Sequence, residues 1–236
     1  SSGIGERAAD YLSSEGASVF ALDKDLDGLK RLKKKNNSIR YFRCDLANKE
    51  SVDKAFEQLA LDNSSIDILI NSAAIMFNSP IVRLQDGQLI VHNHEDWKTV
   101  IDVNLTGTFY VTSHVVKNML SFRKKGLIIN FSSICAQGNS GQAAYSASKA
   151  GVEGFSKALA KELGPLGIRT VILSPGFIDT PGMHQAMSEK GIKKWSNLNP
   201  LRRLGVIEEV LEGIKMIILN DYINGTTIEI NGGLTI

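Results

Sequence analysis

The chain has 236 residues, of which 43% are hydrophobic and 22% are charged, and this ordinary apolar content excludes an intrinsically disordered chain. The 27 basic and 25 acidic residues leave a net charge of only +2, so the sequence carries no basic footprint for nucleic acid. No apolar stretch reaches the ~18 residues of a membrane span, and two cysteines cannot form a disulfide framework. We therefore expect one cytoplasmic domain over residues 1–236 that has neither nucleic acid nor membrane as a partner.

Apolar periodicity predicts strands that alternate with helices along the chain. The expected order is a helix over 6–12, a strand over 16–23, a helix over 26–35, a strand over 39–45, a helix over 51–61 and a strand over 66–71. A long polar connection over 77–96 leads to a helix over 97–119, a strand over 126–132, a helix over 143–163 and a strand over 168–174. After an irregular region come a helix over 208–219 and a strand over 227–231. This alternation predicts an α/β fold, a Rossmann-type doubly wound parallel sheet in three layers, α/β/α.

The chain begins with Ser-Ser-Gly-Ile-Gly and runs directly into a helical pattern. In a dinucleotide-binding fold, a glycine-rich turn joins the first strand to the first helix, and Gly3 and Gly5 look like the end of such a turn. We therefore expect roughly ten to twenty further residues before Ser1, enough for one strand and the start of its turn. Otherwise the protein lacks that strand.

Gly3 and Gly5 are candidates for binding a pyrophosphate, because glycine lets the backbone approach closely and a helix N-terminus offers free N–H groups. Asp23 ends the next strand about 20 residues on, where a carboxylate accepts the ribose hydroxyls. Its charge would repel a 2′-phosphate and so favours NAD(H) over NADP(H), a preference that Lys24 beside it would soften. A helix N-cap is the alternative role for Asp23. Asp45 likewise ends a strand and is a second candidate for a cofactor contact, with a turn or cap residue as the alternative.

Tyr145 and Lys149 lie four residues apart in a predicted helix, so the phenol and the ammonium share one face. A cation stabilises a phenolate, whose reference pKa is ~10, and makes tyrosine a better acid–base group at neutral pH. A pair at this spacing also occurs by chance in ordinary helices. Its context favours chemistry, because a strand over 128–133 precedes it and Asp-Val-Asn-Leu at 102–105 lies on the helix before that strand.

These motifs together resemble the short-chain dehydrogenase/reductase family, and the resemblance covers the whole chain. Further matches are Asn-Ser-Ala-Ala at 71–74, Ser-Pro-Gly-Phe-Ile-Asp-Thr at 174–180, and Asn-Gly-Thr-Thr-Ile-Glu-Ile-Asn-Gly-Gly at 224–233. The stretch 138–142 also resembles 3-oxoacyl-acyl-carrier-protein reductases. The long loop over 81–95 and the stretch 141–149 resemble type II 3-hydroxyacyl-CoA dehydrogenases.

The resemblance implies a role for each matching residue. Tyr145 would exchange a proton with the substrate oxygen, and Ser133 would hydrogen-bond that oxygen. Lys149 would lower the tyrosine pKa and hold the nicotinamide ribose, while Asn104 would hold a water that links Lys149 to solvent. Besides Tyr145 and Lys149, the cofactor contacts would come from Gly3, Ile4, Gly5, Asp23, Asp45, Asn71, Ala73, Pro175, Gly176 and Thr180.

Besides the incomplete glycine-rich turn at its start, the chain departs from the family pattern at two motifs. Ala74 replaces the glycine of the family's Asn-Asn-Ala-Gly, which would crowd the site slightly. Two adjacent serines leave the catalytic serine open. Counting from Gly126 at the strand start favours Ser133, whereas counting back thirteen residues from Tyr145 gives Ser132, and we choose Ser133.

The predicted function is an oxidoreductase that transfers a hydride between a nicotinamide cofactor and a secondary alcohol or ketone, with a 3-hydroxyacyl/3-oxoacyl thioester as a candidate substrate. The rival is a non-catalytic dinucleotide-sensing or interaction protein on the same fold. The segment over about 177–204 would close on the substrate, and Met183, Met187 and Trp195 suggest an apolar one. His92 and His94 lack ligands at metal-binding spacing, so we predict no metal site and expect solvated loop histidines.

The helices over 97–119 and 143–163 carry apolar residues on more than one face. These are Val103, Phe109, Tyr110, Val111 and Val115 on the first helix, and Val152, Phe155, Leu159 and Leu163 on the second. A single contact with the sheet is not expected to bury stripes that wide. In the family these helices pair across a two-fold axis, which suggests a homotetramer. A monomer with ordinary apolar surface residues is the alternative.

Overall fold

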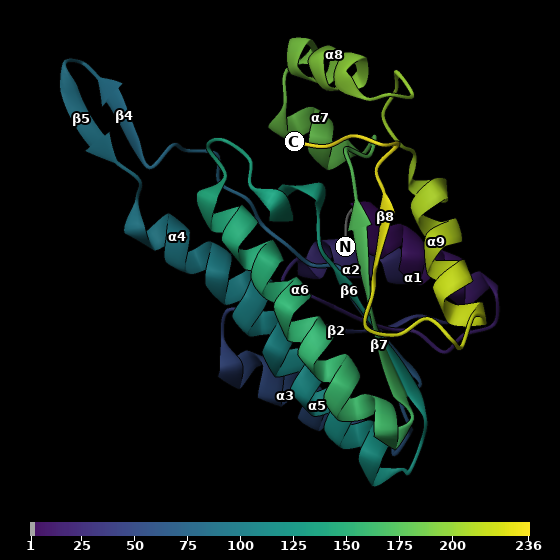
Figure 1. Cartoon of the computed structure of the whole chain (residues 1–236). Coiled ribbons are helices and arrows are strands. Elements are labelled where there is room, and N and C mark those ends of the chain that lie inside the picture. The colour runs from purple at the N-terminus through teal and green to yellow at the C-terminus, as the bar shows by residue number, and fades with distance from the viewer. Residues whose placement is uncertain (1–2) are drawn as a thin grey trace.

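The computed structural model describes residues 3–236, and parallel strands with helices on both faces form its centre (Figure 1). The parallel strands are β1 (Phe20–Asp23), β2 (Arg40–Arg43), β3 (Ile68–Asn71), β6 (Gly126–Phe131), β7 (Ile168–Pro175) and β8 (Thr227–Ile230). They form two sheets, one of β1 with β2 and one in the order β3–β6–β7–β8. The predicted Rossmann-type α/β fold is therefore confirmed. Ser1 and Ser2 of the N-terminal motif lie outside the described residues.

The two faces of β6 separate two apolar cores. The helices are α1 (Gly3–Ser14), α2 (Leu26–Lys35), α3 (Lys49–Ala60), α4 (His94–Ile101), α5 (Gly107–Ser121), α6 (Ala143–Leu163), α7 (Pro181–Ala186), α8 (Glu189–Leu198) and α9 (Ile207–Leu219). Leu127, Ile129 and Phe131 pack with α1 and α9, whereas Ile128 packs with α3, α5 and α6. Successive side chains of a strand point to opposite faces. The continuous apolar run of β6 therefore allows helices to cover both sides. Within residues 3–236, no helix combines the length and apolarity needed to cross a bilayer.

A β-hairpin interrupts the connection over 77–96, which the sequence analysis treats as a polar loop. Strands β4 (Val82–Gln85) and β5 (Gln88–Val91) pair antiparallel and project from the body of the protein (Figure 1). Asp86 and Gly87 form the turn, with φ values of 53° and 77°. Asp-Gly suits a two-residue hairpin turn because such turns place both residues at positive φ. The expectation of an irregular loop is therefore wrong.

The helix predicted over 97–119 consists of α4, a π-helical turn over Asp102–Thr106, and α5. In the π-turn, the amide of Gly107 donates to the carbonyl of Asp102, five residues earlier rather than four. Asn104 lies in this turn and is buried. The region after β7 that was predicted to be irregular contains the two short helices α7 and α8.

Four of the nine apolar residues assigned to a subunit interface are buried within the chain itself. Val111, Val115 and Val152 are at most 5% exposed, and Leu163 is 8% exposed. Phe109 keeps 49% of its surface exposed. The core therefore explains part of the width of the two stripes, while Val103, Tyr110, Phe155 and Leu159 are half-buried.

His92 is buried at the base of the hairpin, so its prediction as a solvated loop residue is wrong. Its side chain is 7% exposed, and neither ring nitrogen has a hydrogen-bond partner among the described residues. Its backbone amide donates to the carbonyl of Ile81 across 2.7 Å. Pairing of the two hairpin strands thus returns the chain to the protein body at His92, whereas His94 is exposed, as expected.

Candidate active site

The two hydroxyl groups predicted to hold a substrate oxygen lie next to one another. Tyr145 stands in the first turn of α6, and Ser133 follows the carboxyl end of β6. Ser133 caps a short 3₁₀ helix over Ile134–Gln137, where its hydroxyl accepts from the amide of Cys135 at 3.2 Å. The same hydroxyl lies beside the phenol of Tyr145, whose pKa it lowers. Capping of the 3₁₀ helix therefore directs the hydroxyl of Ser133 towards Tyr145.

Ser132 points away from this pair. It is buried, and its hydroxyl donates to a carboxylate oxygen of Glu153 across 2.7 Å. Glu153 lies one helical turn beyond Lys149 on α6. Adjacent residues of an extended chain alternate in direction, so only one of the two serines can face Tyr145. This geometry supports the choice of Ser133.

Lys149 is almost completely buried, with 3% of its surface exposed. Its Nζ donates to the carbonyl of Phe131 across 2.7 Å and lies 5.7 Å from the centre of the Tyr145 ring. An ammonium has three donors, and the described residues supply it with this one acceptor. A ribose hydroxyl is a fitting second acceptor, so the site suits a nicotinamide nucleotide.

Burial shifts the pKa of both groups towards their neutral forms. It lowers the pKa of Lys149 to about 8. It raises the pKa of Tyr145 to about 12, against the opposing effect of the hydrogen bond from Ser133. Lys149 is not among the groups that shift the pKa of Tyr145 in this structure, so the expected lowering by Lys149 stays a prediction. At neutral pH the phenol is protonated.

Asn104 connects three parts of the site. Its side-chain oxygen accepts from the amide of Ile75 at 2.8 Å, and its nitrogen donates to the Ile75 carbonyl at 2.9 Å and to the Ser148 hydroxyl at 3.1 Å. Ser148 in turn donates to the carbonyl of Tyr145 at 2.7 Å. The π-turn thus ties the segment after β3 to the helix that carries Tyr145 and Lys149.

The N-terminal end of α1 approaches the segment after β3 very closely. A Cβ at Gly5 would lie 2.5 Å from the hydroxyl of Ser72, so a larger residue there would require that hydroxyl to rotate away. Gly3 has a φ of 61°, which glycine adopts without strain. Ile4 packs its side chain against the core, so only its backbone can face a cofactor. A helix N-terminus with this backbone exposure fits the phosphates of a dinucleotide.

Asp23 and Asp45 both hold the turns that follow their strands. The carboxylate of Asp23 accepts from the amide of Asp25 at 2.9 Å, and that of Asp45 accepts from the amide of Ala47 at 3.0 Å. The N-cap of α2 is Asp25, whose side chain accepts from Gly28, so the alternative assignment of this cap to Asp23 is wrong. Each carboxylate retains acceptor capacity for ribose or adenine, since an ionised carboxylate has about four lone-pair sites.

Asn71 directs its side chain into the protein. Its amide donates to the hydroxyl of Thr112 at 3.0 Å and to the side-chain oxygen of Asn130 at 2.8 Å. These bonds connect β3 to α5 and β6, so the residue contributes to the site by fixing the end of its strand. Ala73 and Ala74, which follow, are exposed.

The segment after β7 is equally constrained. Pro175 ends the strand and is buried, and a Cβ at Gly176 would lie 2.8 Å from the Cα of Asn231. Thr180 caps α7, accepting from the amide of Met183 at 3.2 Å. Because parallel strands end at one edge of a sheet, Asn71, Ser133 and Pro175 share an edge, which is where open α/β sheets bind ligands.

An apolar cluster adjoins the two hydroxyls, and we refer to it as the acyl-side cluster. Its buried members are Ile134, Cys135 and Leu234, and the side chains that pack against them are Tyr145, Phe177, Trp195 and Ile236. Burial raises the pKa of the Cys135 thiol, as suits a packing residue. Phe177 and Trp195 lie in the segment predicted to close on the substrate, whereas Ile134 and Leu234 were not predicted for the site. The place of Ile134 directly after Ser133 was the available signal.

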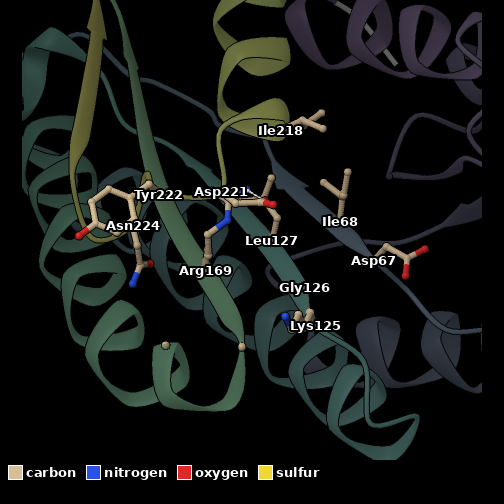
Figure 2. Close-up of a pocket in the computed structure, with 12 residues that line it drawn as sticks. Asp67, Ile68, Lys125, Gly126, Leu127, Arg169, Ile218, Asp221, Tyr222 and Asn224 are labelled. Atoms are coloured by element: carbon tan, nitrogen blue, oxygen red, sulfur yellow. Dashed lines mark hydrogen bonds and ion pairs between the residues drawn. The ribbon is translucent and has the colours of Figure 1, made fainter.

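A cavity of about 550 Å³ lies at the opposite edge of the sheet from Tyr145 (Figure 2). Asp67, Lys125 and Arg169, which stand at the amino ends of β3, β6 and β7, line it together with residues after α9. The guanidinium of Arg169 already donates to the carbonyls of Ile223 at 2.7 Å and Ile217 at 3.1 Å. We therefore assign this arginine to holding the chain after α9.

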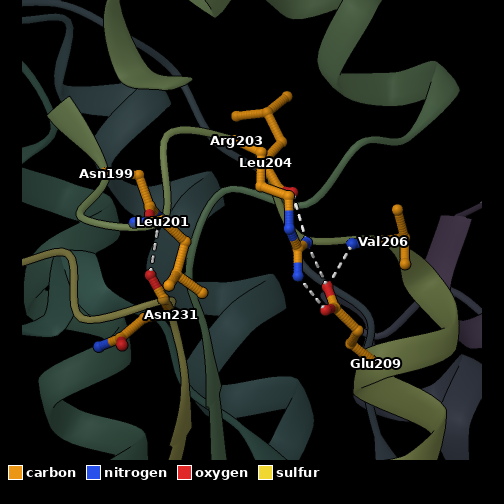
Figure 3. Close-up of polar contacts among 7 residues, drawn as sticks. All are labelled: Asn199, Leu201, Arg203, Leu204, Val206, Glu209 and Asn231. Atoms are coloured by element: carbon orange, nitrogen blue, oxygen red, sulfur yellow. Dashed lines mark hydrogen bonds and ion pairs between the residues drawn. The ribbon is translucent and has the colours of Figure 1, made fainter. Parts of the chain in front are cut away.

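A second cavity, of about 320 Å³, adjoins Phe177 at the carboxyl ends of β7 and β8. Beside it, Arg203 donates to Glu209 at 2.9 Å, and Asn199 donates to the carbonyl of Asn231 at 2.9 Å (Figure 3). Arg203 lowers the pKa of Glu209 to about 2, so this pair remains ionised at neutral pH. These bonds fix the C-terminal end of the segment that contains α7 and α8.

Comparisons with known proteins show which family the chain belongs to. A family profile described as "Enoyl-(Acyl carrier protein) reductase" matches residues 1–235. The chain is 37% identical to the 3-oxoacyl-[acyl-carrier-protein] reductase FabG of Buchnera aphidicola subsp. Baizongia pistaciae, over 98% of this chain and 93% of that protein. It is 36% identical to the FabG of Thermotoga maritima, over 100% and 94% of the two chains. A solved structure of 4-hydroxyisoleucine dehydrogenase complexed with NADH superposes with a TM-score of 0.88 and 30% identity, over 98% of this chain and 94% of that chain.

Proposed function

We propose that this chain, which belongs to the short-chain dehydrogenase/reductase family, reduces the ketone of a 3-oxoacyl thioester to the alcohol. The protein is a nicotinamide-dependent oxidoreductase. The observation that carries the proposal is that Tyr145, Ser133 and the buried Lys149 stand together after the carboxyl end of β6, where the phenol can supply the proton that reduction of a ketone needs at the carbonyl oxygen. The acyl-side cluster beside that phenol supports an apolar acyl chain, and the names of the FabG relatives support the thioester.

In this proposal each side chain of the site has one task. Ser133 donates a hydrogen bond to the substrate carbonyl oxygen and so stabilises the negative charge that develops there. Tyr145 gives the same oxygen its proton. Lys149, held by the Phe131 carbonyl, binds the nicotinamide ribose and stabilises the phenolate that proton transfer leaves behind. Asn104 holds the segment after β3 against α6, which fixes the distance between cofactor and phenol.

The nicotinamide supplies the hydride when it is bound. We propose NAD(H) rather than NADP(H), because the carboxylate of Asp23 ends β1 at the edge where the adenosine ribose would lie. Gly3 and Gly5 would leave their backbone open to the pyrophosphate, with Ile4 anchoring the turn in the core. We further propose that the protein works in the cytoplasm as a homotetramer, with the exposed Phe109 of α5 in an interface.

The test is a substrate screen that follows nicotinamide absorbance, with 3-oxoacyl thioesters first and simple ketones second. We expect NADH oxidation with the thioesters, at a higher kcat/KM than with ketones of the same chain length. A protein that binds NADH and turns over no ketone in the panel would contradict the proposal. It would support the rival function of dinucleotide sensing.

A further inference from the structure

Helix α8 forms a cover over the acyl-side cluster while burying little of itself. None of its 10 residues is buried, and its charged residues Lys190, Lys193 and Lys194 are exposed. Its Trp195 packs against the cluster that Tyr145 also contacts. The indole ring lies 4.5 Å from the ring of Phe177, centre to centre. A single large side chain therefore connects this helix to the site.

The segment that carries α8 is anchored at both of its ends. Ile178 and Gly205 form a parallel β-bridge, and the amide of Asp179 donates to the Gly205 carbonyl at 2.8 Å. The chain that follows α8 is held by the Arg203–Glu209 pair and by the hydrogen bond from Asn199 to the carbonyl of Asn231 (Figure 3). Because the ends are fixed, the position of α8 relative to Tyr145 depends chiefly on what Trp195 packs against.

We propose that Trp195 is a specificity-determining residue, whose indole closes the far end of the acyl site and limits the length of the chain that is accepted. The inference rests on the proposed function, since it assigns the acyl chain of the substrate to the cluster beside Tyr145. The walls of the site are Ile134, Cys135 and Leu234, which are 4–7% exposed. Trp195 is one of the partly buried side chains that pack against these walls, and it is the one that α8 supplies.

The chemistry of the wall defines the ligand. Aliphatic and aromatic groups line it, so each methylene of an acyl chain gains by leaving water, and polar substituents along the chain would lose their hydrogen bonds. A hydrophobic pocket discriminates one methylene by roughly 10- to 200-fold. Removing an indole opens space for several methylenes, which makes the effect measurable.

The experiment compares 3-oxobutanoyl and 3-oxodecanoyl thioesters in the intact protein and in Trp195→Ala. We expect the ratio of kcat/KM for the long over the short substrate to rise by about tenfold or more, mainly through KM for the long one. Trp195→Phe keeps an aromatic wall and should give an intermediate ratio. Trp97→Ala, at the second tryptophan on α4, is the matched control and should leave the ratio unchanged.

Tryptophan fluorescence provides a readout that does not depend on turnover. The chain has two tryptophans, so Trp97→Phe leaves Trp195 as the only emitter and Trp195→Phe leaves Trp97. Adding 3-oxodecanoyl thioester with oxidised cofactor should change the emission of the first protein and leave that of the second unchanged. Equal ratios in Trp195→Ala and the unaltered protein, with unaltered circular dichroism, would overturn the inference.

Failure of the proposed function is a separate outcome. If the unaltered protein reduces simple ketones but no thioester, the thioester substrate is wrong, and the chain-length comparison is made with short and long 2-alkanones. A shift towards the longer ketone in Trp195→Ala would still support the assignment of Trp195, and the absence of a shift would refute it.

Discussion

The hydroxyl of Ser132 donates a hydrogen bond to the carboxylate of Glu153 across 2.7 Å, which turns the side chain of Ser132 away from Tyr145. The neighbouring serine therefore has the position that catalysis requires. Ser133→Ala should lower kcat by about 100-fold, the usual effect of removing a donor to a developing oxyanion. Ser132→Ala should leave kcat nearly unchanged and lower the melting temperature, since Glu153 would lose a buried partner. Steady-state kinetics and thermal unfolding of both variants test this, and the reverse order of kinetic effects would make Ser132 the catalytic serine.

Replacing Tyr145 by Phe should separate binding from chemistry. The ring that packs on the acyl-side cluster remains, while the proposed proton donor is removed. General acid–base catalysis contributes typically 100- to 10,000-fold, so we expect a loss of turnover in that range with an unchanged dissociation constant for NADH. Lys149→Ala should weaken both, because that side chain is proposed to hold the ribose. Substantial activity in the Phe variant would refute the mechanism.

The reductase activity should fall as the pH rises through about 8. Lys149 has its pKa lowered to about 8 by burial, so above that pH it loses the charge that stabilises the phenolate. Tyr145, with a pKa of about 12, stays protonated over the same range and does not cause the decline. The measurement is kcat for reduction from about pH 6 to about pH 10 at saturating cofactor. A flat profile across that range would contradict this role of Lys149.

Deprotonation of the same lysine should raise the stability of the folded protein, whereas it lowers the activity. Its folded-state pKa of about 8 lies below the ordinary lysine pKa of 10.5, so between these values the unfolded chain binds the proton more strongly. Stability therefore rises with pH in this window as the cost of burying a charge is relieved. Melting temperatures of the unaltered protein and Lys149→Met should converge as the pH rises towards about 10. A constant difference between them would show that Lys149 does not titrate there.

Asp23 should control the choice of cofactor. Asp23→Asn keeps an oxygen that can accept from the amide of Asp25, and removes the charge that would repel a 2′-phosphate. We expect NADPH to bind this variant at least about tenfold more tightly than it binds the unaltered protein, a change that corresponds to 1.4 kcal/mol. Titrations with NADH and NADPH make the comparison, and Asp45→Asn is the control. Tighter binding of NADPH than NADH by the unaltered protein would overturn the preference for NAD(H).

The sequence was sufficient to predict the parallel sheet, because each strand is a short apolar run between helical patterns. The span of α6 was predicted over 143–163 and is observed over the same residues. The hairpin was missed although the Asp86-Gly87 turn was visible, since the polar residues around it obscured two short alternating strands. Local pattern is a reliable guide where an element is long, and a weaker one where four residues make a strand.

What the sequence could not supply was the direction of individual side chains. Asn71, His92 and Ser132 all lie in segments that were assigned to the site or to solvent, and all three are directed into the protein. Their directions depend on partners far away in the sequence, such as Thr112 for Asn71. The acyl-side cluster also joins residues 134–135 with residue 234, a contact that no short-range pattern reports.

The π-turn over Asp102–Thr106 limits which mutations the chain can tolerate. A π-turn is equivalent to one residue inserted into a regular helix, and each residue rotates a helix by about 100°. Without that insertion, α5 would be rotated relative to α4, and Thr112 and Val115 would face away from the sheet that they now contact. Deleting one residue here would disturb both helices and the contacts of Asn104 together. Substitutions in this turn alter one side chain at a time, so the segment should tolerate a change of residue far better than a change of length.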